Sequence, residues 1–191
     1  MERDFVGRWF NVEALESCDF TIVAIDRACR IRWVNPAWHR FAVANGAPDV
    51  QQRYGNGSFY LQGVTPPLRS FFETGFAVAL ARREIFEQIY ECSSPQIFRQ
   101  FFLRALPLGS EGLLLEHSRV VEHPHCGVPS DLPPASYART DGTILQCSNC
   151  RRVRRAEGAS WDWVPAWTKA PPPYTSHGLC AACSAFYWGV K

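Results

Sequence analysis

Two Cys-x-x-Cys pairs constrain the C-terminal quarter of this chain more than any other feature. Cys147 and Cys150 form the first pair, and Cys180 and Cys183 form the second. Each pair can hold one edge of a tetrahedron, with thiolate sulfurs about 2.3 Å from a metal ion. A block of about fifty residues buries little apolar surface of its own, so a metal that links the two pairs is physically motivated. We predict a structural Zn²⁺ held by these four cysteines.

The same pattern has two other interpretations, since Cys-x-x-Cys pairs also cycle through disulfides and the four thiols could be buried incidentally. Haem attachment is excluded, because Arg151 and Ser184 stand where a histidine would have to follow each pair.

His177 lies three residues before Cys180. We expect it to hydrogen-bond a ligand sulfur, with replacement of one sulfur as the alternative. Four protein ligands leave no position for a reacting water, so we expect no catalysis by this metal.

The size and charge of the chain limit what surrounds this site. A length of 191 residues allows one ordinary domain and a small appendage. A net charge of +2 gives no overall argument for nucleic acid or for an anionic membrane. The longest apolar runs are too short to span a bilayer, and no apolar signal segment follows the N-terminus. We therefore expect a cytoplasmic protein, in which thiols stay reduced, without a membrane partner.

The N-terminal segment, residues 1–17, has apolar side chains at helical spacing. Phe5, Trp9 and Val12 are separated by charged residues, which predicts an amphipathic helix. Its apolar stripe needs a partner, either in the same chain or in a second copy, and the sequence favours neither. These three residues are the candidate dimer contacts.

Residues 18–122 combine strand and helix signals. Asn35 before Pro36 is typical of a helix start, because the asparagine can cap free amides and the proline has no N–H to leave unpaired. Gly46 is a natural left-handed stop, and Thr65-Pro66 opens a second, longer helix. Strands are expected over residues 20–25, 30–34, 84–92, 97–106 and 112–121. This order predicts an α+β fold with one mainly antiparallel five-stranded sheet and helices.

Two neighbouring stretches carry a family resemblance. Ile22-Val23-Ala24-Ile25-Asp26, a tight turn, and the stretch from Ile31 to Trp38 with its Asn35-Pro36-Ala37 resemble the first half of a PAS sensory domain. Residues 90–118 are similar to its second half. The resemblance implies a PAS-like sheet with helices over a pocket.

The same resemblance raises the question of a cofactor in that pocket. Haem is not expected, because residues 66–83 contain no histidine to bind the iron. Flavin is not expected either, and a flavin photo-adduct could not form, because Ser58 stands where the light-sensing relatives have a reactive cysteine. The sequence leaves open whether a small apolar or aromatic ligand occupies the interior.

The C-terminal third begins with a proline-rich stretch, residues 123–140, which we expect to be an extended linker. His123, His125 and Cys126 in it are a weaker metal candidate without a matching partner. Residues 141–191 follow, and their two cysteine pairs with His177-Gly178 resemble a Cys-x-x-Cys…His-Gly-x-Cys-x-x-Cys module found beside bacterial sensor and response-regulator domains. This resemblance implies signalling rather than a particular reaction.

A run of arginines directly follows the first cysteine pair: Arg151, Arg152, Arg154 and Arg155. We favour a solvated face that balances the thiolates over a ridge that contacts phosphates or a partner.

The sequence shows no recognisable nucleophile–base pair and no paired carboxylates of the kind that acid–base catalysis uses, so we predict that the chain is not an enzyme. We expect a sensory or regulatory adaptor of bacterial signalling that acts by protein–protein contact and self-associates. The alternatives are a nucleic-acid-binding regulator that uses the arginines, and a thiol redox or zinc-release sensor.

Overall fold

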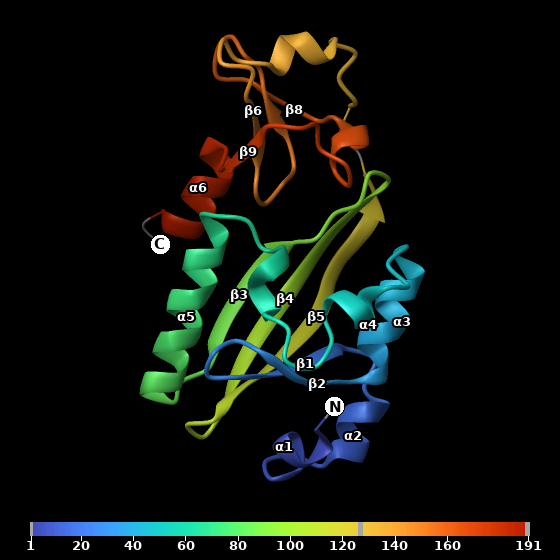
Figure 1. Ribbon diagram of the computed structural model, residues 1–191, viewed down its shortest axis with the longest axis vertical. Helices are drawn as coiled ribbons and strands as arrows, with labels where there is room; N and C mark the ends of the chain where they lie inside the picture. The colour runs from blue at the N-terminus through green and yellow to red at the C-terminus, as the bar shows by residue number, and fades with distance from the viewer. Residues whose placement is uncertain (1, 126–127, 190–191) are drawn as a thin grey trace. The chain divides into compact units, whose positions relative to one another are not determined.

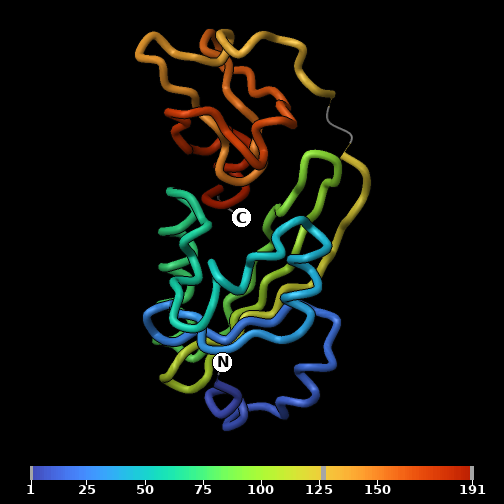
Figure 2. Tube along the Cα trace, turned by 45° about the vertical axis from the view of Figure 1, so that its right-hand side comes forward, coloured from blue at the N-terminus to red at the C-terminus, as the bar shows by residue number. Residues whose placement is uncertain are grey.

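The computed structural model describes residues 2–125 and 128–189, which group into two units (Figure 1). The first unit comprises residues 2–63, 71–89 and 101–119, and the second comprises residues 64–70, 90–100 and the described residues from 120 onward. Figure 2 traces the C-terminal part of the second unit from orange to red. Within the described residues, no helix is both long enough and apolar enough to cross a membrane.

The larger sheet has five strands in the order β2-β1-β5-β4-β3. Strand β1 pairs antiparallel with β2 on one side and with β5 on the other. The α+β fold class with a five-stranded antiparallel sheet, as predicted, is therefore confirmed. The strands are β1 Thr21–Asp26, β2 Ile31–Val34, β3 Phe86–Glu91, β4 Ile97–Leu108 and β5 Gly112–Pro124.

Helix α3 follows its predicted start and stop signals, whereas the longer helix α5 begins at Leu68, after the predicted Thr65-Pro66 start, and the Thr65 hydroxyl does not cap it. The predicted stop Gly46 lies just after α3 and has a φ of 73°, a left-handed conformation that glycine adopts without strain. In the first unit, Phe86 of β3 lies edge-on to the rings of Phe72 and Phe76, which project from α5. The remaining elements of this part of the chain are α3 Pro36–Ala44, α4 Val50–Arg53, the 3-10 helix η1 Tyr60–Gly63 and α5 Leu68–Arg82.

Asn35 joins three elements through one fully buried side chain. Its Oδ1 accepts hydrogen bonds from the backbone N–H of Ile22 (3.0 Å) and of Trp38 (3.2 Å). Its Nδ2 donates to the carbonyls of Leu15 (3.2 Å) and Phe20 (2.8 Å). The predicted helix cap is confirmed, and the same amide also fixes the start of β1.

The N-terminal segment differs from the prediction of one helix. It forms α1 Arg3–Gly7 and α2 Val12–Ser17, because the Asn11 side chain accepts from the backbone N–H of Glu13 and Ala14 and so starts a new helix. The apolar side chain of Phe5 is 7% exposed and packs in a cluster of its own unit. The other buried members of this cluster are Val6, Ile22, Ala24, Trp33, Leu108 and Leu114.

This packing changes the list of candidate dimer contacts. Phe5 is covered by its own sheet, and Val12 is partly buried against the same cluster. Trp9 is 44% exposed, with its ring against Gly109, where a Cβ would lie 2.5 Å from the ring. Phe5 is therefore a core residue rather than a dimer contact. Self-association stays a prediction, with Trp9 as the most exposed of the three side chains.

A buried histidine lies in the sheet of the first unit. His117 of β5 is 5% exposed, and its Nε2 lies 2.9 Å from the Tyr60 hydroxyl of η1. Burial lowers the pKa of His117 to about 4, so the ring is neutral at physiological pH. The neighbouring Leu113 and Leu115 on β5 are fully buried.

The second unit contains a smaller sheet in the order β8-β7-β6-β9. Strand β6 pairs antiparallel with β7 and parallel with β9. Its apolar cluster is small: Tyr137, Ile144 and Val153 are buried, and Trp167 packs partly against them. The elements are β6 Ile144–Cys147, β7 Val153–Arg154, β8 Trp161–Asp162, the 3-10 helix η3 Pro165–Trp167, β9 Thr175–Gly178 and α6 Ala181–Trp188.

The proline-rich stretch is more structured than an extended linker. Strand β5 continues to Pro124, and the 3-10 helix η2 Pro134–Tyr137 follows later in the stretch. Tyr137 is 1% exposed, and its hydroxyl lies 2.6 Å from Ser130 Oγ and 2.9 Å from Asp162 Oδ2. Part of the segment expected to be a linker thus supplies a core side chain to the second unit.

Candidate metal centre

The structure brings the four cysteines of the two pairs together. The Sγ atoms of Cys147, Cys150, Cys180 and Cys183 all lie within 4.8 Å of one another, and all four residues are buried. The sulfurs of Cys150 and Cys180 are 3.8 Å apart. Tetrahedral zinc with Zn–S bonds of about 2.3 Å places its sulfurs about 3.8 Å apart. The donor set and its spacing therefore fit a Zn²⁺ ion.

The backbone of the second unit fixes both pairs. Strand β6 ends at Cys147, and the turn that follows is closed by the Arg151 N–H, which donates to the Cys147 carbonyl (3.1 Å). Arg151 has a φ of 60° and so reverses the chain in the left-handed region. The second pair begins at Cys180, the residue that precedes α6, and Cys183 lies in the first turn of that helix.

Hydrogen bonds among the sulfurs favour one thiolate. The thiols of Cys150 and Cys183 hydrogen-bond the Cys147 sulfur and lower its pKa far below the usual value of a thiol. The same bonds raise the pKa of Cys150 and of Cys183, which act as donors. The backbone N–H of Cys180 also points at the Cys147 sulfur (3.5 Å). This arrangement stabilises negative charge on the Cys147 sulfur, and a metal ligand needs that charge.

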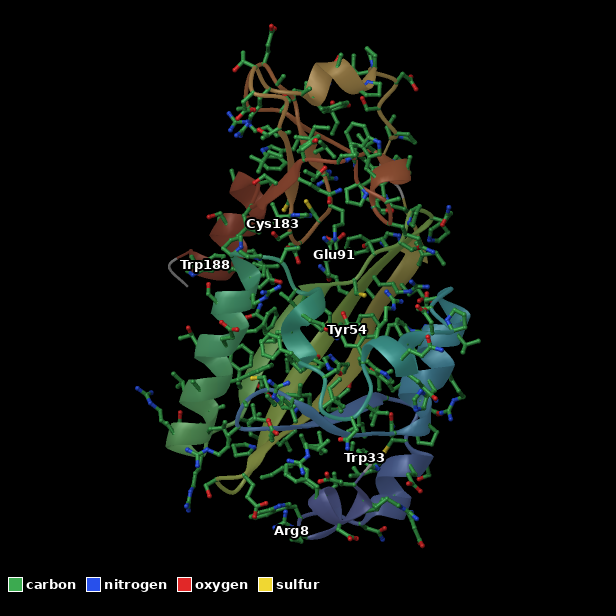
Figure 3. All side chains as sticks on the ribbon, in the orientation of Figure 1. Arg8, Trp33, Tyr54, Glu91, Cys183 and Trp188 are labelled. Carbon is green, nitrogen blue, oxygen red and sulfur yellow. The ribbon has the colours of Figure 1, made fainter. Side chains whose placement is uncertain are left out.

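Asn149, inside the first Cys-x-x-Cys pair, contacts one of the sulfurs. Its Nδ2 donates to Cys183 Sγ (3.3 Å), and its Oδ1 lies 3.1 Å from the Tyr187 hydroxyl and 3.4 Å from the Glu91 backbone nitrogen. Cys183 and Glu91 are labelled in Figure 3. Sequence reasoning missed this residue, although its place between two ligands was a signal, because its partners lie far away in the sequence.

His177 lies on β9, where its backbone is paired with that of Gln146 on β6. It is half-buried, and burial lowers the pKa of its ring. Its ring is outside the group of four ligand atoms. Among the described residues outside the four cysteines, the side chain that hydrogen-bonds a ligand sulfur is that of Asn149, so a role of His177 at the metal stays a prediction.

The side chains of Arg154 and Arg155 have hydrogen-bond partners within the second unit. Val153, between Arg152 and Arg154, is fully buried, and Arg155 forms an ion pair with Asp162 (2.8 Å). Arg154 donates to the Gly158 carbonyl (3.3 Å). The Arg151 carbonyl accepts from the Gln146 side chain, and the Arg152 carbonyl accepts from the Cys147 N–H. Arg154 and Arg155 line an open hollow of about 860 Å³ together with Arg139.

The two histidines of the weaker metal candidate, His123 and His125, stack on aromatic rings. The His125 ring stacks on Trp163, with centroids 3.8 Å apart and planes at 8°. His123 stacks on Phe98 with centroids 5.0 Å apart. Cys126 lies outside the described residues. Both rings thus have aromatic contacts within the second unit.

No protein-family model matches this chain, and no curated protein sequence matches it either. The chain is similar to the solved PAS domain of BvgS from Bordetella pertussis, with 13% identity, a TM-score of 0.44, and coverage of 58% of this chain and 84% of that one. It is also similar to the photoactive yellow protein domain of the sensor histidine kinase Ppr from Rhodospirillum centenum, with 11% identity, a TM-score of 0.39, and coverage of 62% and 100%.

A further similar structure is a VqmA dimer from Vibrio cholerae, with 9% identity and a TM-score of 0.41. The match covers 59% of this chain and 52% of that one, so the chain spans about half the length of VqmA. At these scores and identities the likenesses carry no information on ligand, partner or activity.

Proposed function

We propose that this chain is a regulatory protein whose C-terminal unit is held by a structural zinc ion. The observation that carries the proposal is the group of four buried sulfurs within 4.8 Å of one another. Cys147, Cys150, Cys180 and Cys183 would hold the ion and leave no open coordination position. When bound, the metal supplies folding free energy rather than a reacting group.

We propose further that the protein acts by contact with another protein rather than by catalysis. The five-stranded sheet, together with the sequence resemblance to PAS domains, supports a sensory or regulatory role for the first unit. The zinc-held unit presents exposed apolar side chains on α6, Phe186 (48% exposed) and Trp188 (49% exposed), that suit a protein surface. On this proposal a change in either unit alters partner binding.

Metal analysis and native mass spectrometry of the purified chain test the zinc site directly. We expect one zinc ion for each chain, retained through dialysis without chelator. A fully folded chain without metal would overturn the proposal. Treatment with mild oxidant separates the structural site from a redox sensor, because a zinc-release sensor loses its metal reversibly while a structural site retains it.

Light scattering over a range of protein concentrations tests self-association. Replacing the half-exposed ring in Trp9→Ser should weaken association without unfolding the first unit, whereas Phe5 cannot be used because it is buried. A monomer at every concentration removes the self-association from the proposal.

Nucleic-acid binding is a second candidate, supported by the hollow that Arg139, Arg154 and Arg155 line. Because phosphate contacts release counterions, such binding would fall steeply with salt. A fluorescence anisotropy titration with labelled duplex at low salt decides this point. Absence of binding there removes the candidate.

A further inference from the structure

We infer that Asn149 is a positioning residue that couples the zinc ligand Cys183 to the backbone of strand β3 at Glu91. The inference deepens the proposed zinc site and rests on it. Two of the three atoms that Asn149 contacts are the Cys183 sulfur (3.3 Å) and the Glu91 nitrogen (3.4 Å). Both belong to the second unit, in which residues 90–100 group with the C-terminal part of the chain.

The chemistry of the neighbours fixes the orientation of the Asn149 amide. A backbone N–H can only donate, so the Glu91 nitrogen must face the amide oxygen. The Tyr187 hydroxyl donates to the same oxygen (3.1 Å) from α6, where Tyr187 is 8% exposed. With two donors on Oδ1, the NH₂ group is left to point at the Cys183 sulfur, which accepts. The side chain therefore has one arrangement that satisfies all three contacts.

The metal strengthens this arrangement. A zinc-bound thiolate carries negative charge and accepts a hydrogen bond better than a neutral thiol does. With zinc present, the Cys183 sulfur holds the Asn149 amide, and the amide oxygen holds the Glu91 N–H. When zinc leaves, the Cys183 sulfur is no longer held at one position by the metal, so the amide loses a fixed partner. The N–H of Glu91 should then exchange with solvent more readily.

A neighbouring contact provides a matched control. Ser148 lies beside Asn149 in the same turn, and its Oγ donates to the Pro66 carbonyl (3.0 Å) instead of contacting a sulfur. Ser148→Ala therefore removes a side-chain hydrogen bond from this turn without touching Cys183 or Glu91. Any effect of general loosening of the turn should appear in both variants.

The experiment measures zinc affinity by competition with a chelator, and hydrogen exchange of residues 90–100 with zinc present and removed. In the wild-type chain we expect zinc to slow exchange at Glu91. Asn149→Ala should bind zinc about tenfold more weakly, as outer hydrogen-bond partners of metal ligands commonly do when lost. It should also abolish the zinc-dependent difference at Glu91. Ser148→Ala should change neither quantity.

A second variant covers the case in which Asn149→Ala does not fold. Tyr187→Phe keeps the buried ring and removes one donor to Oδ1, so it should shift zinc affinity and Glu91 exchange in the same direction by smaller amounts. The inference is overturned if either variant folds and matches the wild type in both measurements, or loses zinc affinity with no change at Glu91. A wild-type chain that binds no zinc overturns the proposed function together with the inference.

Discussion

The two units of this protein differ in the side chains that they bury. In the first unit, apolar side chains from α1, β1, β2, β4 and β5 bury one another, as in the cluster that contains Phe5 and Trp33. Among the described residues of the second unit, one apolar cluster has three buried members, and another buried cluster consists of four cysteines. A smaller apolar cluster offsets less of the entropy of ordering the chain, so we expect the second unit to depend on its cysteines more than the first unit depends on any bound group.

The difference also appears in the way each unit uses polar groups. The first unit buries Asn35 with four hydrogen bonds, so the amide is satisfied by the backbone alone. The second unit buries sulfurs whose charge the backbone satisfies only in part. Its stability should therefore depend on what binds those sulfurs, and that of the first unit should not.

Removal of a metal ligand should have the largest effect, and only in the second unit. Cys147→Ser should abolish zinc binding and unfold the second unit, because the metal contributes on the order of 10 kcal/mol to such small folds. Metal analysis and the fluorescence of the tryptophans at positions 161, 163 and 167 report the loss. Cys18→Ser, in the first unit, is the matched control and should keep the metal. Equal zinc content in the two variants would contradict the comparison.

A core truncation should act in the first unit alone. Phe5→Ala removes a ring that is 7% exposed and should lower the free energy of unfolding by about 4 kcal/mol in a urea titration. Val43→Ala, at a position that is 62% exposed in the same unit, should change it by less than about 0.5 kcal/mol. Zinc content should not change in either variant. If Phe5→Ala reduced only self-association and left stability intact, Phe5 would be a dimer contact after all.

Loss of the buried amide should be slightly less costly. Asn35→Ala removes four buried hydrogen bonds, two from the N–H groups of Ile22 and Trp38 and two to backbone carbonyls, which should cost about 3 kcal/mol. Asn45→Ala removes a single hydrogen bond to the Phe41 carbonyl at the end of α3 and should cost less than about 1 kcal/mol. Equal losses in the two variants, measured by urea unfolding, would show that the four contacts of Asn35 do not act together.

Acid should weaken the first unit through His117. Its pKa in the fold is about 4, below the value of about 6.5 in the unfolded chain, so the unfolded state binds the proton more readily. Its contribution to stability is complete above pH 6.5 and is lost as the pH falls toward 4. The loss amounts to about 2 kcal/mol at pH 5. Urea titrations at pH 7 and 5 should show this decrease in the wild type. In His117→Gln the decrease in the free energy of unfolding between pH 7 and pH 5 should be smaller. An equal decrease in the variant and the wild type would exclude His117 as the source of the acid effect.

Much of the first unit could be predicted from the sequence, because its signals are local. Pro36 after Asn35 marks a helix start, and the strands are long enough to show their pattern. The break between α1 and α2 was missed, since Asn11 lies inside an apolar periodicity that continues through it. Phe5 and Trp9 have the same spacing signal, so only the packing distinguishes the buried ring from the exposed one.

In the second unit the sequence indicated the cysteine cluster but not the sheet that holds it. Strands β7 and β8 have two residues each, which is too short for any alternation to show. Asn149 could not be assigned, because its contact with Glu91 joins positions 58 residues apart in the chain. Short-range patterns identify ligands, whereas the groups around them depend on segments that fold together from distant positions.

The buried ring of Tyr137 determines where the C-terminal part of this protein can be truncated. A fragment that starts at residue 141, the boundary predicted from the sequence, would lack that ring and leave a cavity beside Ile144 and Val153. A boundary upstream of Ser130 would keep the tyrosine together with the hydroxyl that its own hydroxyl contacts. Proteolysis of the intact chain should accordingly spare the residues around position 137.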